Sequence, residues 1–326
     1  MFITILDKMK YVFIGPTLLA GIGQVTNRYV TLLKDMGHHA EYVDLSNPHP
    51  TLSKYDIGFA FVLPIKYQLD IVDTIMQSCD KRNYMTICET ETVSPQYGIF
   101  VGRYDTMFTS SKFCRDILSR QFPSISWKIL NLYAPPTSSI ERPLQTGRRP
   151  YIFYTIGNII DPRKNIRMLL RAFEECDFPN TRLLLKATCN RKVEIDQKNV
   201  IVINGLISDE QMHKIHFGSD CYINCSHSEG VGMGAVEAAL HHKPVIITDY
   251  GGLKEYVDTP FVVPCEVKEC GINDFLFTSD LRWGYPSYEK LLITMKRCYI
   301  TGIRKWDHTY TENLVSSIPE DLINNL

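Results

Sequence analysis

Two glutamates, Glu229 and Glu237, are separated by seven residues in the segment SHSEGVGMGAVEAALHHKPVIITDYGG. Gly230, Gly232 and Gly234 lie between them, where a predicted strand gives way to a predicted helix. A glycine-rich turn into a helix N-terminus presents unpaired backbone N–H groups and the positive end of the helix dipole, which suit a phosphate. The two carboxylates can accept hydrogen bonds from sugar or ribose hydroxyls. The segment therefore predicts an anion site flanked by two hydrogen-bond acceptors.

A second polar cluster follows another predicted strand, which ends at Gly157. The loop after it carries Arg163 and Lys164, and an amphipathic helix comes next. Two cations at the carboxyl end of a strand can neutralise a diphosphate, Lys as a mobile point charge and Arg as a planar fork. Taken alone, a glutamate pair is a common feature of helices and an Arg-Lys pair is a common feature of solvated loops. Only their combination is informative.

Strand-like and helix-like segments alternate through both halves of the chain, the pattern of parallel sheets covered by helices. The predicted strands are residues 10–15, 40–43, 57–62, 84–88, 106–109, 151–156, 181–186, 200–203, 221–224 and 245–248. The predicted helices are residues 21–36, 165–175, 208–217, 233–242, 288–299 and 304–314, with two more starting near Pro64 and Ser111. The sequence therefore predicts the α/β class.

The chain has 326 residues, too many for one ordinary core, so we expect two doubly wound domains. A segment with four prolines and no apolar periodicity, YAPPTSSIERPLQTGRRP, interrupts the alternation. We predict a first domain over residues 1–134, a linker over 135–150 and a second domain over 151–326. The last helices of the second domain could cross back to the first.

Composition excludes several classes of protein. Lys and Arg number 35 against 36 Asp and Glu, a net charge of -1, which argues against a nucleic-acid binder and against a disordered chain. The ten cysteines form no C-x-x-C pair, which indicates reduced thiols in a reducing compartment. No transmembrane segment is visible, and residues 11–23 are explained better by a strand and a glycine loop than by a signal peptide. We expect a cytoplasmic protein.

The order of strand, Gly157, basic loop and helix, followed by EGVGMGAVE and KPVIITDYGG, resembles the retaining glycosyltransferases of family four. The resemblance covers residues 151–257. It implies the GT-B fold, in which two Rossmann-like, doubly wound α/β domains face a central cleft. It also implies that the second domain binds a nucleoside-diphosphate sugar. By this likeness Glu229 would contact the donor sugar, Glu237 the ribose and Lys164 the diphosphate.

The resemblance implies further site residues. The other expected donor contacts are Gly21, Gly23, Gly157, Asn158, Gly205, Leu206, Ile207, Gly232, Met233 and Gly234, with Gly205 to Ile207 beside the base. Many members of the family carry an Arg where Asn158 stands, and Arg163 would take over its charge. Many also carry a His near the reacting sugar, where this chain has Glu89. Glu89 and Glu91 are therefore acceptor-side candidates, and we place Glu89 with Glu229, Lys164 and Arg163 among the expected catalytic residues.

The implied reaction moves a sugar from a UDP- or GDP-linked donor to a glycan, a glycoconjugate or another hydroxyl acceptor, with retention of configuration. Charge builds on the departing diphosphate, so fixed positive potential at the leaving group is the main requirement. No D-x-D pair occurs in the sequence, and the family generally does without a metal. We therefore expect no metal and no cofactor besides the donor. We expect no nucleic-acid partner, while peripheral contact with a membrane stays open.

Three alternatives remain. A sugar-nucleotide epimerase of the same fold would use the same donor contacts, and a catalytically silent sugar-nucleotide binder would keep them without turnover. An NAD-dependent dehydrogenase is suggested by Gly21, Gly23 and Asp44, but Thr26 stands where that fingerprint has a third small residue. His213 and His216 share a predicted helix face without an evident third metal ligand, which favours an ordinary surface helix.

Overall fold

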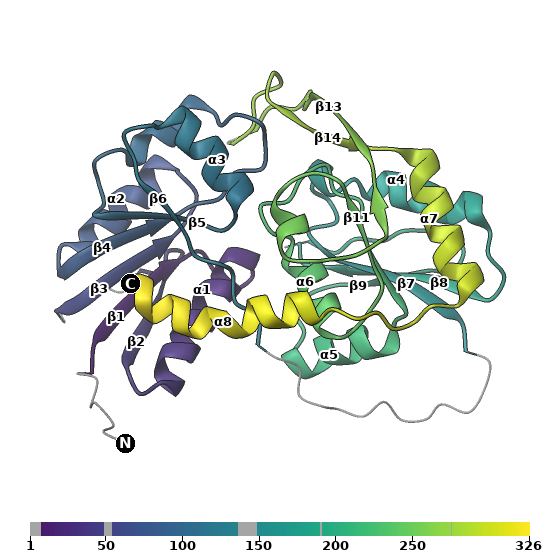
Figure 1. Ribbon diagram of the computed structural model, residues 1–326, viewed down its shortest axis with the longest axis horizontal. Coiled ribbons are helices and arrows are strands. Elements are labelled where there is room, and N and C mark those ends of the chain that lie inside the picture. Colours follow the sequence, from purple (N-terminus) through teal and green to yellow (C-terminus); the bar gives the residue numbers. More distant parts are fainter. Residues whose placement is uncertain (1–7, 49–53, 136–148, 190, 275) are drawn as a thin grey trace. The chain divides into compact units, whose positions relative to one another are not determined.

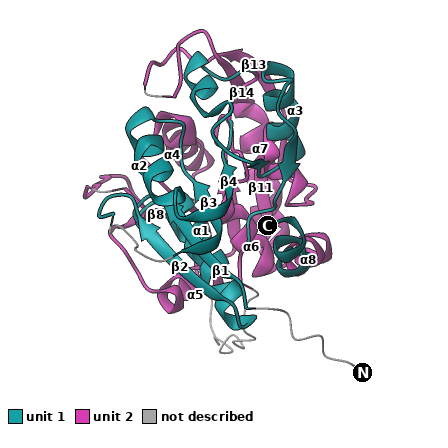
Figure 2. Cartoon of the chain, turned by 90° about the vertical axis from the view of Figure 1, so that its left-hand side faces the viewer, with its two compact units in different colours: residues 1–88, 92–133, 317–326 teal, residues 89–91, 134–316 magenta. Residues whose placement is uncertain are grey.

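The computed structural model describes residues 8–48, 54–135, 149–189, 191–274 and 276–326 (Figure 1). The chain divides into two compact units, which we call unit 1 and unit 2 (Figure 2). Unit 1 comprises residues 1–88, 92–133 and 317–326, and unit 2 comprises residues 89–91 and 134–316. The predicted linker, residues 135–150, lies almost wholly outside the described residues.

Unit 1 is a parallel sheet flanked by helices. The strand order is β2-β1-β3-β4-β5-β6. The strands are β1 (Lys10–Gly15), β2 (His39–Asp44), β3 (Tyr55–Phe61), β4 (Cys79–Met85), β5 (Thr106–Thr109) and β6 (Trp127–Ile129). The helices are α1 (Gly21–Asp35), α2 (Lys66–Met76), the 3-10 helix η1 (Pro95–Phe100) and α3 (Lys112–Gln121).

The sequence encodes the ends of these helices locally. Helix α1 buries Val25, Tyr29 and Leu33 on one face, the spacing of an amphipathic helix. It is followed by Gly37, whose φ of 89° lies in the left-handed region that favours glycine after a helix. Helix α3 begins after Ser111, whose side chain accepts a hydrogen bond from the backbone N–H of Cys114, as a capping serine should.

Unit 2 is built on the same plan. Its sheet is also parallel, with the strand order β12-β11-β10-β7-β8-β9. The strands are β7 (Tyr151–Gly157), β8 (Thr181–Ala187), β9 (Val200–Ile203), β10 (Cys221–Asn224), β11 (Val245–Thr248) and β12 (Val262–Val263). The helical segments are η2 (Pro162–Lys164), α4 (Ile166–Cys176), α5 (Asp209–Gly218), α6 (Met233–Leu240), η3 (Gly252–Glu255) and α7 (Tyr288–Thr301).

The order of the strands in unit 2 determines where a ligand can bind. The chain builds the sheet outward from β7 through β8 to β9 and then returns to place β10 on the other side of β7. The connections therefore reverse direction between β7 and β10, and their carboxyl ends flank a topological switch point. Open α/β sheets bind ligands at this point.

Two further elements complete the chain. An antiparallel hairpin joins β13 (Cys265–Glu269) to β14 (Arg282–Pro286). Helix α8 (Thr309–Asn325) belongs to unit 2 up to Ser316 and to unit 1 from Ser317.

Several predicted boundaries were wrong. Strand β4 begins at Cys79 rather than near Tyr84, because its first four residues alternate between half-buried and exposed and lack an apolar run. Helix α8 begins at Thr309 rather than Arg304, because the Asp307 carboxylate accepts hydrogen bonds from the N–H and hydroxyl of Thr309 and forms a turn there. The hairpin β13–β14 and the short strands β6 and β12 were not predicted.

Candidate functional site

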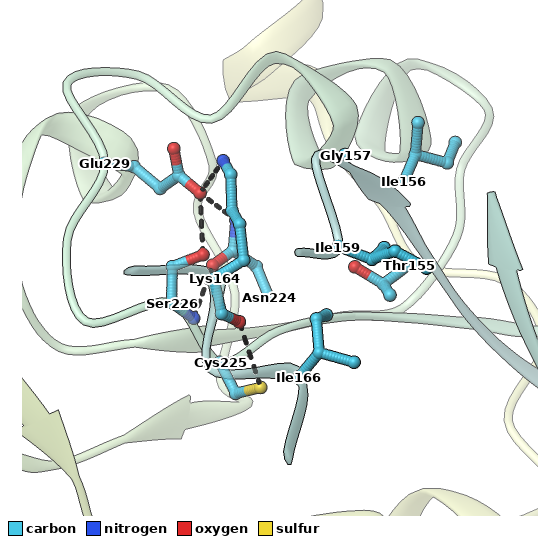
Figure 3. A pocket seen from close by; sticks show the side chains of 10 residues that line it. All are labelled: Thr155, Ile156, Gly157, Ile159, Lys164, Ile166, Asn224, Cys225, Ser226 and Glu229. Carbon is cyan, nitrogen blue, oxygen red and sulfur yellow. Dashed lines mark hydrogen bonds and ion pairs between the residues drawn. The ribbon is translucent and has the colours of Figure 1, made fainter. Parts of the chain in front are cut away.

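A pocket opens at the switch point of unit 2 (Figure 3). Its walls come from the carboxyl ends of β7 and β10 and from the loops that follow these strands. The lining residues are Thr155, Ile156, Gly157, Ile159, Lys164, Ile166, Asn224, Cys225, Ser226 and Glu229. The pocket thus contains Gly157, Lys164 and Glu229, three of the residues that the sequence marked as site candidates.

Glu229 lies in this pocket with almost no access to solvent, at 5% exposure. One carboxylate oxygen, Oε1, accepts hydrogen bonds from Lys164 Nζ at 2.6 Å, from Ser226 Oγ at 2.7 Å and from Asn224 Nδ2 at 3.3 Å. Figure 3 shows these three side chains pointing toward the same oxygen. A carboxylate held by this many donors has one orientation, which a contact to a ligand hydroxyl requires.

Arg163 forms ion pairs with three carboxylates. Its Nη1 lies 3.0 Å from Glu229 Oε2 and 3.0 Å from Glu89 Oε1, and it also donates to the backbone carbonyl of Ser228 at 2.8 Å. Its Nη2 lies 3.3 Å from Asp161 Oδ2. Glu89 comes directly after Cys88, far from Arg163 in the sequence, and it belongs to unit 2. The structure thus brings together all four residues that we expected to be catalytic: Glu89, Arg163, Lys164 and Glu229.

Glu229 and Glu89 differ in their electrostatic surroundings. Burial raises the pKa of Glu229, but the charges of Lys164 and Arg163 and the hydrogen bonds from Lys164 and Ser226 outweigh it and hold this pKa at about 2. For Glu89, burial outweighs the attraction of Arg163, and the nearby Glu229 adds repulsion, so its pKa is raised. Glu229 is therefore a permanent anion, while Glu89 takes up a proton more readily. Divergent pKa values in neighbouring carboxyl groups are typical of acid–base sites.

The turn into α6 follows Glu229 directly. Gly232 precedes the helix with a φ of 79°, a left-handed conformation that glycine adopts without strain. A Cβ on Gly234 would collide with the hydroxyl of Tyr222 and lie 3.3 Å from the carbonyl oxygen of Ile156. Both glycines are needed to begin α6 against the ends of β7 and β10. The first N–H groups of this helix, at Met233 and Gly234, belong to the turn in which we expect a phosphate.

Glu237, the second glutamate of the pair, lies one turn into α6 beside a buried histidine. His216 Nε2 is 3.9 Å from Glu237 Oε2, and His216 Nδ1 is 2.9 Å from the hydroxyl of the fully buried Tyr154. A proton on Nε2 would face the carboxylate, whereas a lone pair there would repel it, so we assign the Nε2–H tautomer. Burial lowers the pKa of His216, although Glu237 opposes this shift. The neutral His216 ring therefore directs its Nε2–H toward the Glu237 carboxylate.

The interpretation of His213 and His216 as an ordinary surface pair was wrong. His216 is only 1% exposed, and its ring stacks on that of His241, with ring centroids 4.4 Å apart. His241 Nδ1 donates to the Glu237 carbonyl at 2.7 Å, so its Nε2 accepts a hydrogen bond from His213 Nδ1 at 2.9 Å. Among the described residues, no group of three or more His, Cys, Asp or Glu side chains is placed to hold a metal ion.

The loop between β9 and α5 carries the candidates Gly205, Leu206 and Ile207. Gly205 has a φ of 79°, which again suits glycine, and Leu206 is 67% exposed. The Gly205 carbonyl accepts a hydrogen bond from Lys186 Nζ at 2.6 Å.

Asn158 is exposed at the end of β7, and its backbone carbonyl accepts a hydrogen bond from the N–H of Asp161.

Gly21 and Gly23 lie in unit 1, at the start of α1. A Cβ on Gly23 would lie 2.5 Å from the carbonyl oxygen of Pro16 and closer still to that of Thr17. Nothing lies within 4 Å of the corresponding position on Gly21. Gly23 therefore permits a close approach of the loop after β1 to the helix.

Sequence reasoning did not identify several residues that hold Glu229 and Arg163. Ser226 and Asn224 bind the Glu229 carboxylate, and Asp161 binds Arg163. Asn224 could have been found from its place at the carboxyl end of a buried strand, where ligand-binding residues of α/β sheets gather. Nothing in the sequence indicates that Ser226 and Asp161 point at their partners.

A family match and similar solved structures relate the chain to known proteins. Residues 150–270 match the family described as "Glycosyl transferases group 1". No curated protein sequence matched the chain. Similar solved structures include a glycosyltransferase from Rickettsia africae, at 13% identity and a TM-score of 0.64 over 98% of this chain and 94% of that chain. Sucrose-phosphate synthase from Thermosynechococcus elongatus is similar at 12% identity and a TM-score of 0.64, over 97% of this chain and 100% of that one.

A third similar structure is that of WaaG, a glycosyltransferase involved in lipopolysaccharide biosynthesis, at 12% identity and a TM-score of 0.59 over 96% of this chain and 98% of that chain. At such identities the likeness concerns the fold. It confirms the predicted α/β GT-B fold of two Rossmann-like domains. The family match over residues 150–270 supports a glycosyltransferase. In the described part of the chain, no helix combines the length and the apolar character needed to cross a bilayer.

Proposed function

We propose that this chain is a retaining, metal-independent glycosyltransferase of family four. It would transfer a sugar from a UDP- or GDP-linked donor to a hydroxyl of a glycan or glycoconjugate. The observation that carries the proposal is the cluster of Lys164, Arg163 and Glu229 at the switch point between β7 and β10. This cluster lies within the residues that match a glycosyltransferase family, in a chain with the GT-B fold, which supports the assignment.

The chemistry of each group fits a part of the donor. The diphosphate would lie against the N-terminus of α6 at Gly232 to Gly234, with Lys164 as its cation. Glu229, a permanent anion, would accept hydrogen bonds from hydroxyls of the sugar. Glu237 would accept from the ribose.

The leaving group determines the catalytic requirement. When the bond between the sugar and the diphosphate breaks, negative charge grows on the phosphate oxygen. The Lys164 ammonium can stay close to this oxygen because the lysine side chain is flexible. Arg163 stays with Glu229, Glu89 and the Ser228 carbonyl, which makes it the fixed part of the site. Glu89 would face the acceptor. We propose that the departing phosphate takes the acceptor's proton, as the resemblance implies.

The donor can be identified by binding. The purified full chain would be titrated by calorimetry with UDP, GDP, ADP and NAD, each with and without Mg2+. We expect one nucleoside diphosphate to bind without Mg2+, and we expect its affinity to fall at least tenfold in Lys164→Met and in Glu237→Gln, since hydrogen bonds to charged groups contribute about 1.5–3 kcal/mol. Lys214→Met is the matched control, because Lys214 makes an equally short ion pair, 2.6 Å to Glu210, on an exposed helix face.

Other outcomes favour the alternatives. Binding of NAD alone would contradict the proposal and indicate a dehydrogenase. Conversion of the donor sugar without any acceptor, followed by NMR, would indicate an epimerase. The anomeric configuration of a transfer product, read from the same spectra, decides whether the reaction is retaining.

All ten cysteines are free, which agrees with the reducing, cytoplasmic compartment that we propose.

A further inference from the structure

A buried lysine lies behind the loop that follows β9. Lys186 is near the carboxyl end of β8, paired with Ile156 of β7 on one side and Ile203 of β9 on the other. It is only 2% exposed. Its ammonium donates to two backbone carbonyls, that of Ala187 at 2.7 Å and that of Gly205 at 2.6 Å.

This arrangement is costly. Burial lowers the pKa of Lys186, since removing an ammonium from water disfavours the charged form. Within the described part of the chain, no carboxylate forms an ion pair with this ammonium. A lysine is rarely buried without such a partner, because two carbonyl dipoles compensate less than a counter-charge. The charge-assisted hydrogen bond to Gly205 is therefore the feature to explain.

The loop after β9 is held at successive residues. The side chain of Asn204 accepts from the Val193 N–H at 2.8 Å and donates to the Val193 carbonyl at 2.9 Å. Gly205 follows in the left-handed region with its carbonyl on Lys186. Ser208 then caps α5 by accepting from the backbone N–H of Gln211. Leu206 projects from this backbone and, among the described residues of unit 2, is the most exposed large apolar residue after Ile300.

We propose that Lys186 is a positioning residue for the nucleoside of the donor. It fixes the backbone of residues 204–207, so that the Leu206 side chain and the neighbouring backbone groups meet the flat face and the edge of the base in one geometry. The inference rests on the proposed function, in which Gly205 to Ile207 contact the base. A loop ordered before binding loses little conformational entropy on binding, so its rigidity adds to affinity for the nucleoside.

This role makes a distinctive prediction for ligands that contain only part of the donor. The diphosphate would bind at Lys164 and at the N-terminus of α6, which Lys186 does not contact in the described structure. Loss of the Lys186 ammonium should therefore weaken binding of a nucleoside diphosphate and leave binding of inorganic pyrophosphate unchanged. A general loosening of unit 2 would weaken both.

The experiment uses the full chain with Lys186→Met, which keeps the length of the side chain and removes its three donors. Binding of UDP, GDP and pyrophosphate is measured by calorimetry, with displacement where affinity is low. We expect affinity for the preferred nucleoside diphosphate to fall about tenfold or more, as for loss of a charged hydrogen bond, and affinity for pyrophosphate to stay within about twofold.

Lys243→Met is the matched control. Lys243 is 4% exposed, and its ammonium donates to the Ser219 carbonyl at 2.9 Å, just after the end of α5. The substitution is thus the same chemical change at a second buried lysine bonded to backbone, away from the loop. We expect it to leave both affinities unchanged.

A second variant covers the case in which Lys186→Met does not fold. Leu206→Ala alters an exposed side chain. It should weaken binding of the nucleoside diphosphate severalfold, again without changing pyrophosphate binding. Equal losses for both ligands, or no loss for the nucleoside diphosphate in either variant, would overturn the role of Lys186. Failure of the wild-type chain to bind any nucleoside diphosphate would instead overturn the proposed function, and this inference with it.

Discussion

The ammonium of Lys164 lies 2.6 Å from Glu229 Oε1, so the cation expected at the diphosphate and the anion expected at the sugar form an ion pair with each other. Both side chains are largely buried, with Lys164 at 20% and Glu229 at 7% exposure. A diphosphate that arrives at this site must draw Lys164 away from Glu229. Ser226, Asn224 and Arg163 remain to hold the carboxylate when this happens.

Glu229→Gln should destabilise unit 2 as well as abolish transfer. The amide has nearly the shape of the carboxylate, but it leaves Lys164 and Arg163 with less negative charge beside them in a buried setting. Removing one partner of a buried ion pair costs about 3–5 kcal/mol, and we expect the lower part of this range because Glu89 and Asp161 still face Arg163. Differential scanning calorimetry of the full chain measures the effect.

The matched control for this variant is Glu210→Gln, which removes the exposed ion pair with Lys214, where both side chains are 71% exposed. Exposed pairs of this kind contribute little to stability, so we expect no measurable change. If Glu229→Gln and its control had the same small effect, the ion-pair cluster would not stabilise the fold.

The stability of the folded chain should decrease in acid because of Glu229. Its folded pKa of about 2 lies below the ordinary value of 4.5, so the unfolded chain binds more protons between these two pH values. The contribution is complete above pH 4.5 and is lost as the pH falls toward 2, a total of about 3 kcal/mol. Denaturant unfolding across this range should show a steeper loss in the wild type than in Glu229→Gln. Parallel curves would contradict the assignment.

Glu89 should have the opposite effect on the pH dependence of stability. Its pKa is raised, so the folded chain binds its proton more tightly than the unfolded chain does. The corresponding contribution is present below the ordinary pKa and is lost as the pH rises through the folded value. The window lies above that of Glu229, and the two effects can therefore be separated in one titration.

Glu89→Gln should separate the acceptor side from the donor side. The amide keeps a contact to Arg163 but cannot change its protonation. We expect kcat to fall at least tenfold while the dissociation constant of the nucleoside diphosphate stays within about twofold. We also expect the pH dependence of kcat to lose the step that follows the raised pKa of Glu89. A parallel loss of donor affinity would assign Glu89 to donor binding instead.

Gly23→Ala should destabilise unit 1 by about 1–3 kcal/mol, because the new Cβ would collide with two backbone carbonyls, those of Pro16 and Thr17, which cannot rotate away. Gly21→Ala provides the comparison, since its Cβ would meet nothing within 4 Å. Thermal unfolding of both variants measures the difference. A similar melting temperature for the two would show that the loop after β1 adapts.

The sequence by itself determined most of the helices and strands of both units and the place of the glycine turn before α6. Strand β10, the turn after Glu229 and the helix that carries Glu237 could be predicted because strands, glycines and helix caps are encoded by neighbouring residues. Ser111 and Ser208, for example, cap the predicted helices through hydrogen bonds three residues away. The resemblance to a known family then indicated the chemistry of this turn.

Only the tertiary structure decided which distant residues meet. Arg163 contacts Glu89, 74 residues earlier in the sequence, and Glu229, 66 residues later. His216 lies buried beside Glu237, and Lys186 donates a hydrogen bond to the carbonyl of Gly205. Such contacts depend on strand order, which places β10 beside β7 and so brings the ends of both strands to one pocket. Periodicity along the chain carries no information about that order, because it reports which face of an element is buried and not which element covers it.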